Sequence, residues 1–184
     1  MICQYYYPEN FQITPICEQL VEDGFEITVL TGLPNYPTGV VPKEYKNGRR
    51  DEWINGVHVL RCYEIGRKKG AAGLALNYIS YWRSATMKVR HLSDDYDLVF
   101  VYQLSPITMG IPAIKYAKRN KKPMLLYCCD LWPESIKMYI KNENNPIFKY
   151  FKRISRRVYS ESDYILTQSN SFIKYLNEIH SIPL

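Results

Sequence analysis

The sequence predicts an α/β fold with a doubly wound, mainly parallel Rossmann-like sheet and helices on both faces. Three observations lead to this prediction. Short apolar segments alternate with longer amphipathic segments along the whole chain. Several of the short segments show no polar alternation, so both faces of their sheet must be covered. Strands that follow one another through helices form parallel sheets with right-handed connections.

The length and composition fit one globular unit. The chain has 184 residues, 46% of them hydrophobic, which is enough for a sizeable core. We therefore expect residues 1–184 to form a single Rossmann-like domain. The formal net charge of +6 favours an anionic partner, and phosphate, nucleic acid or acidic lipid would each satisfy it.

The cysteines and the hydropathy pattern bear on location. The five cysteines are odd in number and most lie in apolar segments, so we expect reduced thiols and a cytoplasmic setting. No apolar run approaches the ~20 residues of a membrane span, and the first residues lack the layout of a signal peptide. We expect a protein that is soluble, or peripheral on the inner face of the plasma membrane.

Three strands are expected in the first half of the chain, at residues 2–7, 25–31 and 57–63. Between the first two, apolar residues recur at helical spacing over residues 13–21, and Gly24 suits the end of that helix. Turn-forming residues then open a long irregular stretch that reaches about residue 55. Loops of this length in compact domains are usually functional.

A long helix is expected over residues 70–92, after a basic segment. Its predicted apolar stripe consists of Leu74, Tyr78, Trp82, Ala85, Val89 and Leu92. The stripe either faces the core or dips toward lipid while neighbouring cations meet acidic head groups. The candidate membrane-contact residues are Arg67, Lys68, Lys69, Trp82 and Arg83.

The second half repeats the strand–helix order. Strands are expected at residues 97–102, 123–129 and 164–167, and helices up to residue 120, over 147–159 and over 172–179. In a doubly wound sheet, ligands bind beyond the carboxyl ends of the strands. The residues that directly follow each strand are therefore the candidates for function.

The segment after the fifth strand carries the strongest local signal. It reads Asp130-Leu131-Trp132-Pro133-Glu134-Ser135 and brings two carboxylates and an indole to the ligand edge. We predict that Asp130 orients an acceptor hydroxyl or receives its proton, and that Trp132 and Glu134 help to bind the acceptor. The alternative is that Asp130 caps the following turn.

The loops after the first two strands supply further candidates. Glu9 and Asn10 follow the first strand, and they either reach a ligand or merely shape a turn. Asn35 and Tyr36 lie in the turn-rich segment after the second strand.

Several other sites are excluded. No G-x-G-x-x-G follows the first strand and no G-x-x-x-x-G-K-[ST] occurs, which disfavours a dinucleotide or a P-loop nucleotide. The sequence Asp95-Tyr96-Asp97 precedes its strand, at the wrong edge of the sheet. The three histidines lack ligand spacing, so we predict no metal site. We also expect no nucleic acid, because no nucleic-acid-binding module is recognisable.

Four stretches of the sequence resemble the acceptor-side, N-terminal domain of family 4 glycosyltransferases of the GT-B architecture, and the resemblance covers essentially the whole chain. The stretches are residues 5–11, 27–37, 130–135 and 162–169. Together they look most like the branch that builds bacterial capsule, O-antigen and exopolysaccharide. The resemblance implies a retaining transferase in which Glu9, Asn10, the Asn35-Tyr36 loop and Asp130 face a lipid-linked or saccharide acceptor. It implies no cofactor and no obligatory metal.

In this family a second domain holds the nucleotide-sugar, and we expect that domain to be absent from the chain, which would then be inactive alone. Two other classes of protein stay open. One is a non-catalytic membrane-docking or partner-binding subunit of a split transferase. The other is a flavodoxin-like or nucleotide-binding regulator, which rests on the fold class only.

Overall fold

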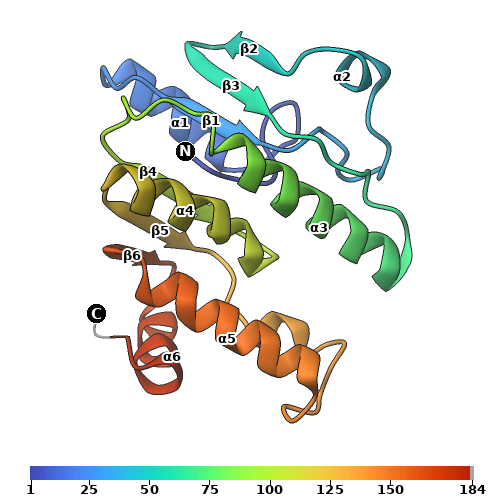
Figure 1. Ribbon diagram of the computed structural model, residues 1–184, viewed down its shortest axis with the longest axis vertical. Coiled ribbons are helices and arrows are strands. Elements are labelled where there is room, and N and C mark those ends of the chain that lie inside the picture. Colours follow the sequence, from blue (N-terminus) through green and yellow to red (C-terminus); the bar gives the residue numbers. More distant parts are fainter. Residues whose placement is uncertain (183–184) are drawn as a thin grey trace. The chain divides into compact units, whose positions relative to one another are not determined.

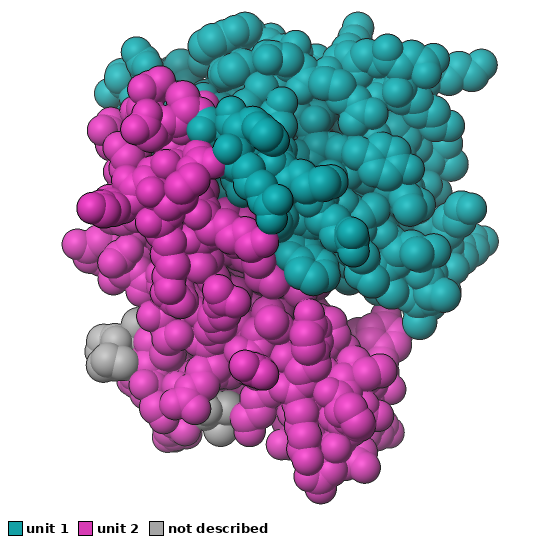
Figure 2. Space-filling view, in the orientation of Figure 1, with its two compact units in different colours: residues 1–92 teal, residues 93–184 magenta. Residues whose placement is uncertain are grey.

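The computed structural model describes residues 1–182 and divides the chain into two compact units, Met1–Leu92 and Ser93–Leu184 (Figures 1 and 2). Each unit carries its own three-stranded sheet. Three of the four strand pairings are parallel, and helices follow the strands. The predicted α/β, mainly parallel Rossmann-like fold is therefore confirmed.

The first unit has the strand order β1-β3-β2. Strand β1 (Thr28–Thr31) pairs in parallel with β3 (Val57–Arg61), where Val29 lies opposite Val59 and both are fully buried. Strand β2 (Asp51–Ile54) pairs with β3 in the antiparallel sense. Strand β3 therefore lies between β1 and β2 and is the central strand of this sheet.

The expected first strand is shorter than predicted. Only Ile2 forms a bridge, in parallel with Leu30, and the backbone of Gln4 accepts a hydrogen bond from Gly32 N at 3.0 Å. The chain then bends at Gln4 and turns at Tyr7, which takes it away from β1. The N-terminal segment therefore pairs with β1 over fewer residues than the six, 2–7, that its apolar run predicted.

Two elements lie inside the stretch that we expected to be irregular. They are the short helix α2 (Lys43–Lys46) and strand β2. Asn55 and Gly56 join β2 to β3 with φ values of 49° and 79°. This conformation is the two-residue hairpin turn that Asn-Gly favours. The prediction of a loop up to about residue 55 was therefore wrong for residues 43–46 and 51–54.

Two longer helices complete the first unit, α1 (Ile13–Glu22) and α3 (Gly70–Lys88). The buried face of α3 differs from the predicted stripe. Ala85 and Val89 of the stripe are buried as predicted, but Leu74, Tyr78 and Trp82 are only half-buried. Before Ala85, the buried residues of the helix are instead Gly73, Asn77 and Tyr81. Asn77 is polar yet fully buried, and its Oδ1 accepts a hydrogen bond from Gln4 of the N-terminal segment at 3.0 Å.

The second unit has three parallel strands in the order β4-β5-β6. They are β4 (Val99–Gln103), β5 (Met124–Cys128) and β6 (Tyr164–Thr167). The α-helices are α4 (Gly110–Asn120), α5 (Pro146–Ser160) and α6 (Asn170–His180). The 3₁₀ helices are η1 (Ile107–Met109) and η2 (Glu134–Ile136). Helix α4 packs on β4 and β5, and α6 packs on β6 (Figure 1).

The core of the second unit is apolar and tightly packed. Val101, Met124 and Leu126 are fully buried. Gly110 at the start of α4 allows a close approach of α5, because a Cβ atom there would lie 2.7 Å from Cγ1 of Val158. Among residues 1–182, no helix has the length and apolar character needed to span a bilayer.

Candidate functional site

In the second unit, the candidate site lies where β4 and β5 end. Gln103 and Cys128 are paired at the last position of these neighbouring parallel strands, so Ser105 and Asp130 leave the sheet at the same edge. The hydroxyl of Ser105 donates a hydrogen bond to Oδ2 of Asp130 at 2.5 Å. The indole Nε1 of Trp132 donates to the same hydroxyl oxygen at 3.2 Å. A chain of two hydrogen bonds therefore orients the carboxylate of Asp130.

The backbone under this carboxylate is also fixed. The buried side-chain amide of Gln103 donates to the carbonyl oxygens of Leu104 at 2.9 Å and of Asp130 at 3.0 Å. The side chain of Asp130 remains partly exposed. Helix η2 begins without a side-chain cap, so the alternative in which Asp130 caps this turn is wrong.

Trp132 is a buried residue in this unit, with 5% of its surface exposed. Its ring centroid lies 4.9 Å from that of Phe151, and its backbone N–H donates to the hydroxyl of Tyr159 at 3.0 Å. The observed contribution of Trp132 is thus to hold Ser105 and to attach the Asp130 segment to helix α5.

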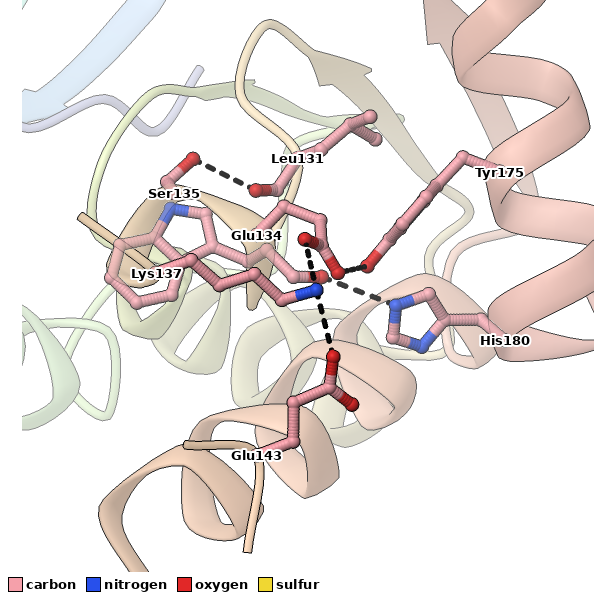
Figure 3. Close-up of polar contacts among 8 residues, drawn as sticks. Leu131, Glu134, Ser135, Lys137, Glu143, Tyr175 and His180 are labelled. Atoms are coloured by element: carbon pink, nitrogen blue, oxygen red, sulfur yellow. Dashed lines mark hydrogen bonds and ion pairs between the residues drawn. The ribbon is translucent and has the colours of Figure 1, made fainter. Parts of the chain in front are cut away.

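Glu134 binds side chains from two neighbouring segments (Figure 3). Its Oε1 accepts a hydrogen bond from the hydroxyl of Tyr175 at 2.9 Å. Its Oε2 lies 2.6 Å from Nζ of Lys137, which also pairs with Glu143 at 2.8 Å. The hydrogen bonds to both carboxylates raise the pKa of Lys137. Both oxygens of Glu134 have partners, so this residue ties η2 to helix α6.

His180 is a buried residue that the sequence pattern did not identify as part of the site. Its Nε2 lies 3.1 Å from the carbonyl oxygen of Trp132, to which it donates in the tautomer that carries the proton there (Figure 3). Burial lowers the pKa of His180, which favours the neutral ring. A single histidine without ligand spacing gives no sequence signal for such a role.

In the first unit, Glu9 fixes the conformation of the Asn35-Tyr36 loop. Its Oε1 accepts hydrogen bonds from the backbone N–H groups of Asn35 at 2.8 Å and Tyr36 at 2.5 Å. Glu9 is 8% exposed, and burial raises its pKa to about 6 although the backbone hydrogen bonds act in the opposite direction. The side chain of the neighbouring Asn10 is exposed.

Asn35 is buried and has internal partners. Its Nδ2 donates to the carbonyl oxygen of Leu33 at 2.8 Å, and its Oδ1 accepts from the backbone N–H of Arg67 at 2.9 Å. Tyr36 is 46% exposed, and its ring centroid lies 5.4 Å from that of Phe11. The Arg67 guanidinium lies 5.8 Å from the same ring. Among the predicted acceptor residues of the first unit, the exposed ones are therefore Tyr36 and Asn10.

A buried polar network supports this loop, and sequence reasoning missed it. Oε1 of Glu64 accepts from Nε2 of Gln4 at 2.7 Å and from Nδ2 of Asn77 at 2.5 Å. Asn77 also donates to the side chain of Asn35 at 3.3 Å. Burial raises the pKa of Glu64 to about 8, so its carboxyl is mostly protonated at neutral pH. The sequence signal for this network was Asn77, a polar residue at helical spacing between Gly73 and Tyr81 on the buried face of α3.

The candidate membrane-contact residues lie on or just before helix α3. Lys68, Lys69 and Arg83 are exposed, whereas Arg67 and Trp82 are half-buried. In the described part of the chain, no group of three His, Cys, Asp or Glu side chains could hold a metal ion. Asp95 and Asp97 are exposed and precede β4.

Comparison with known proteins gives one family match for this chain. The model described as Glycosyltransferase Family 4 matches residues 12–183, which include Asn35, Tyr36 and the Asp130 segment, whereas Glu9 and Asn10 lie just before the matched range. A search of curated proteins gives no match.

Proposed function

Because the chain belongs to glycosyltransferase family 4, we propose that it is the acceptor-binding half of a retaining transferase, whose sugar donor is a nucleotide-sugar. The acceptor is a lipid-linked or other saccharide. The hydrogen bond between Ser105 and the partly exposed Asp130 carries this proposal, because it aims one carboxylate at the ligand edge of the sheet.

We assign Asp130 the role of accepting a hydrogen bond from the acceptor hydroxyl. As the hydroxyl oxygen bonds to the anomeric carbon, its proton moves toward the carboxylate. The bond between that carbon and the donor phosphate breaks, and the nucleoside diphosphate leaves with the electron pair. No metal ion takes part in the role that we assign to Asp130.

Within the first unit, Asn10 and Tyr36 are the exposed residues that we propose for sugar binding. Glu9 and Asn35 act by holding their loop, and Trp132 and Glu134 act by holding the Asp130 segment. The four sequence stretches at residues 5–11, 27–37, 130–135 and 162–169 support a role in capsule, O-antigen or exopolysaccharide synthesis. We propose that the protein acts at the inner face of the plasma membrane. In this assignment a second domain of the transferase binds the donor.

Titration of the ¹⁵N-labelled chain with lipid-linked and simple glycoside acceptors tests the proposal. We expect amide shifts at Asp130, Ser105 and Tyr36, and we expect Asp130→Asn to weaken the response at the first two. Asp163→Asn is the matched control, because Asp163 contacts the backbone of Met124 on a different segment. If the acceptors cause no shifts at Asp130, or if Asp130→Asn changes nothing, the proposal fails.

A non-catalytic docking subunit is the second candidate. It is favoured by one observation: Glu9 and Asn35, two of the predicted acceptor ligands, are buried and use Oε1 and Oδ1, respectively, in internal hydrogen bonds. Such a subunit would bind membranes or a partner through Lys68, Lys69 and Arg83 and would show no response to acceptor sugars. The same titration, followed by vesicle binding of a Lys68→Gln, Lys69→Gln variant, separates the two candidates.

A further inference from the structure

Helix α5 exposes a dense set of positive charges. The exposed cations are Lys149, Lys152, Arg153, Arg156 and Arg157. No acidic residue occurs within Pro146–Ser160, and none of the five forms an ion pair with a residue of the described chain, 1–182. Unpaired cations concentrated on one helix face indicate an anionic partner.

Large apolar side chains are exposed at the start of the same helix and just before it. They are Met138 at 76%, Tyr139 at 62%, Ile147 at 52% and Tyr150 at 44%. Nζ of Lys137 lies 5.7 Å from the ring centroid of Phe148, so the segment that carries Met138 and Tyr139 lies against the first turn of α5 (Figure 1). Apolar and cationic groups are therefore exposed along the same stretch of the second unit.

A groove of about 500 Å³ runs along the flank of α5. It is lined by Tyr150, Arg153, Ile154, Arg157 and Glu161. Glu161 is paired with Lys118 at 2.5 Å, so its charge is compensated. The groove thus offers two guanidinium groups one helical turn apart beside a tyrosine ring and an isoleucine.

The opposite face of α5 is firmly packed. Phe148, Ser155, Val158 and Tyr159 are buried. The charged face is therefore presented by a helix in a fixed orientation, and binding would not require the helix to leave the core.

We propose that the outer face of α5, with the segment from Met138 to Ile147, docks onto an anionic phospholipid membrane. A bilayer presents phosphate groups outermost and an apolar layer directly behind them, which matches cations interleaved with exposed Ile147 and Tyr150. Arg153 and Arg157 bind lipid phosphate from the groove. Nucleic acid fits less well, because its phosphate backbone offers no counterpart for the exposed Met138 and Ile147.

This docking surface is distinct from the α3 residues discussed above, and it does not depend on the proposed function. It has a consequence for the candidate site. The inner face of α5 holds Trp132 through Tyr159 and Phe151, so a membrane-bound α5 would keep the Asp130 segment near the lipid surface. A lipid-linked acceptor would be found there.

Vesicle flotation tests the proposal. The chain should float with vesicles of phosphatidylcholine plus phosphatidylglycerol and should stay unbound with phosphatidylcholine alone. The variant Arg153→Gln, Arg157→Gln should bind about 25-fold more weakly, since each cation near an anionic surface contributes roughly a factor of five. Its matched control is Lys43→Gln, Lys46→Gln, which removes the same charge from two exposed residues of α2 and should bind like the wild type.

The apolar contribution is tested separately at high salt, where screening weakens the electrostatic attraction. Ile147→Ser, Tyr150→Ser should abolish the binding that remains, whereas Val40→Ser, Tyr63→Ser, at two more exposed positions of the first unit, should not. Unchanged circular dichroism of each variant shows that it is folded. The proposal is overturned if the wild type does not float, if both charge variants weaken binding equally, or if only a labelled oligonucleotide binds in an Arg153- and Arg157-dependent manner.

Discussion

The hydroxyl of Ser105 donates a 2.5 Å hydrogen bond to the carboxylate of Asp130, across two loops that are separated by 25 positions in the sequence. A hydrogen bond to a charged group contributes about 1.5–3 kcal/mol. We therefore expect Ser105→Ala to weaken acceptor binding on the order of 10-fold or more while the protein stays folded. Calorimetric titration of the acceptor measures this change. Ser171→Ala, an exposed serine of α6, is the control, and equal effects of both variants would remove Ser105 from the site.

Glu9 determines the stability of the Asn35-Tyr36 loop. Glu9→Ala leaves two backbone N–H groups without their acceptor, and each unsatisfied buried group costs about 1–3 kcal/mol. We expect a loss of roughly 2–6 kcal/mol in the free energy of unfolding, measured in urea. Glu9→Gln keeps an oxygen acceptor and should lose much less. If Gln proves as harmful as Ala, the two hydrogen bonds do not explain the role of Glu9.

The buried Glu64 should make stability depend on pH. Its pKa is raised from the usual 4.5 to about 8 in the folded chain. The stability that the buried, protonated carboxyl contributes is therefore fully present below pH 4.5 and is lost as pH rises through 8. Over this range the free energy of unfolding should fall, relative to Glu64→Gln, by up to about 1.4 kcal/mol per pH unit.

Urea unfolding of both proteins at several pH values measures this difference. Glu9 also titrates in this range, with a pKa of about 6, but it is present in both proteins and largely cancels in the comparison. Parallel stability curves for the wild type and Glu64→Gln would show that Glu64 is already ionised in the folded chain.

Tyr159 links helix α5 to the Asp130 segment. Tyr159→Phe removes the hydroxyl oxygen that accepts from the buried N–H of Trp132, and we expect a loss of about 1–3 kcal/mol in stability. Hydrogen exchange of the Trp132 amide should accelerate by a larger factor than exchange in β5. Tyr150→Phe, at an exposed position of the same helix, should change neither quantity. Equal exchange at Trp132 in both variants would contradict this role.

Local sequence patterns predicted most of the second unit. The runs at residues 97–102, 123–129 and 164–167 became β4, β5 and β6 within two residues at each end. Buried parallel strands need continuous apolar character, which β4 and β5 have, whereas β6 is the more exposed strand of the three. The hairpin of β2 and β3 was missed, although Asn55-Gly56 is its signal. Strand β2 alternates between exposed and half-buried residues, and it exists only through its pairing with β3.

The position of Asp130 just after a buried strand was readable from the chain, since strand ends place their following residues at the ligand edge. Its partner Ser105 was not readable, because only the pairing of Gln103 with Cys128 brings the two loops together. The same holds for Glu64 and Asn77, whose polar side chains are buried because each satisfies the other. Hydrophobic periodicity predicts which residues are buried, whereas hydrogen bonds between distant segments depend on tertiary packing that no local pattern encodes.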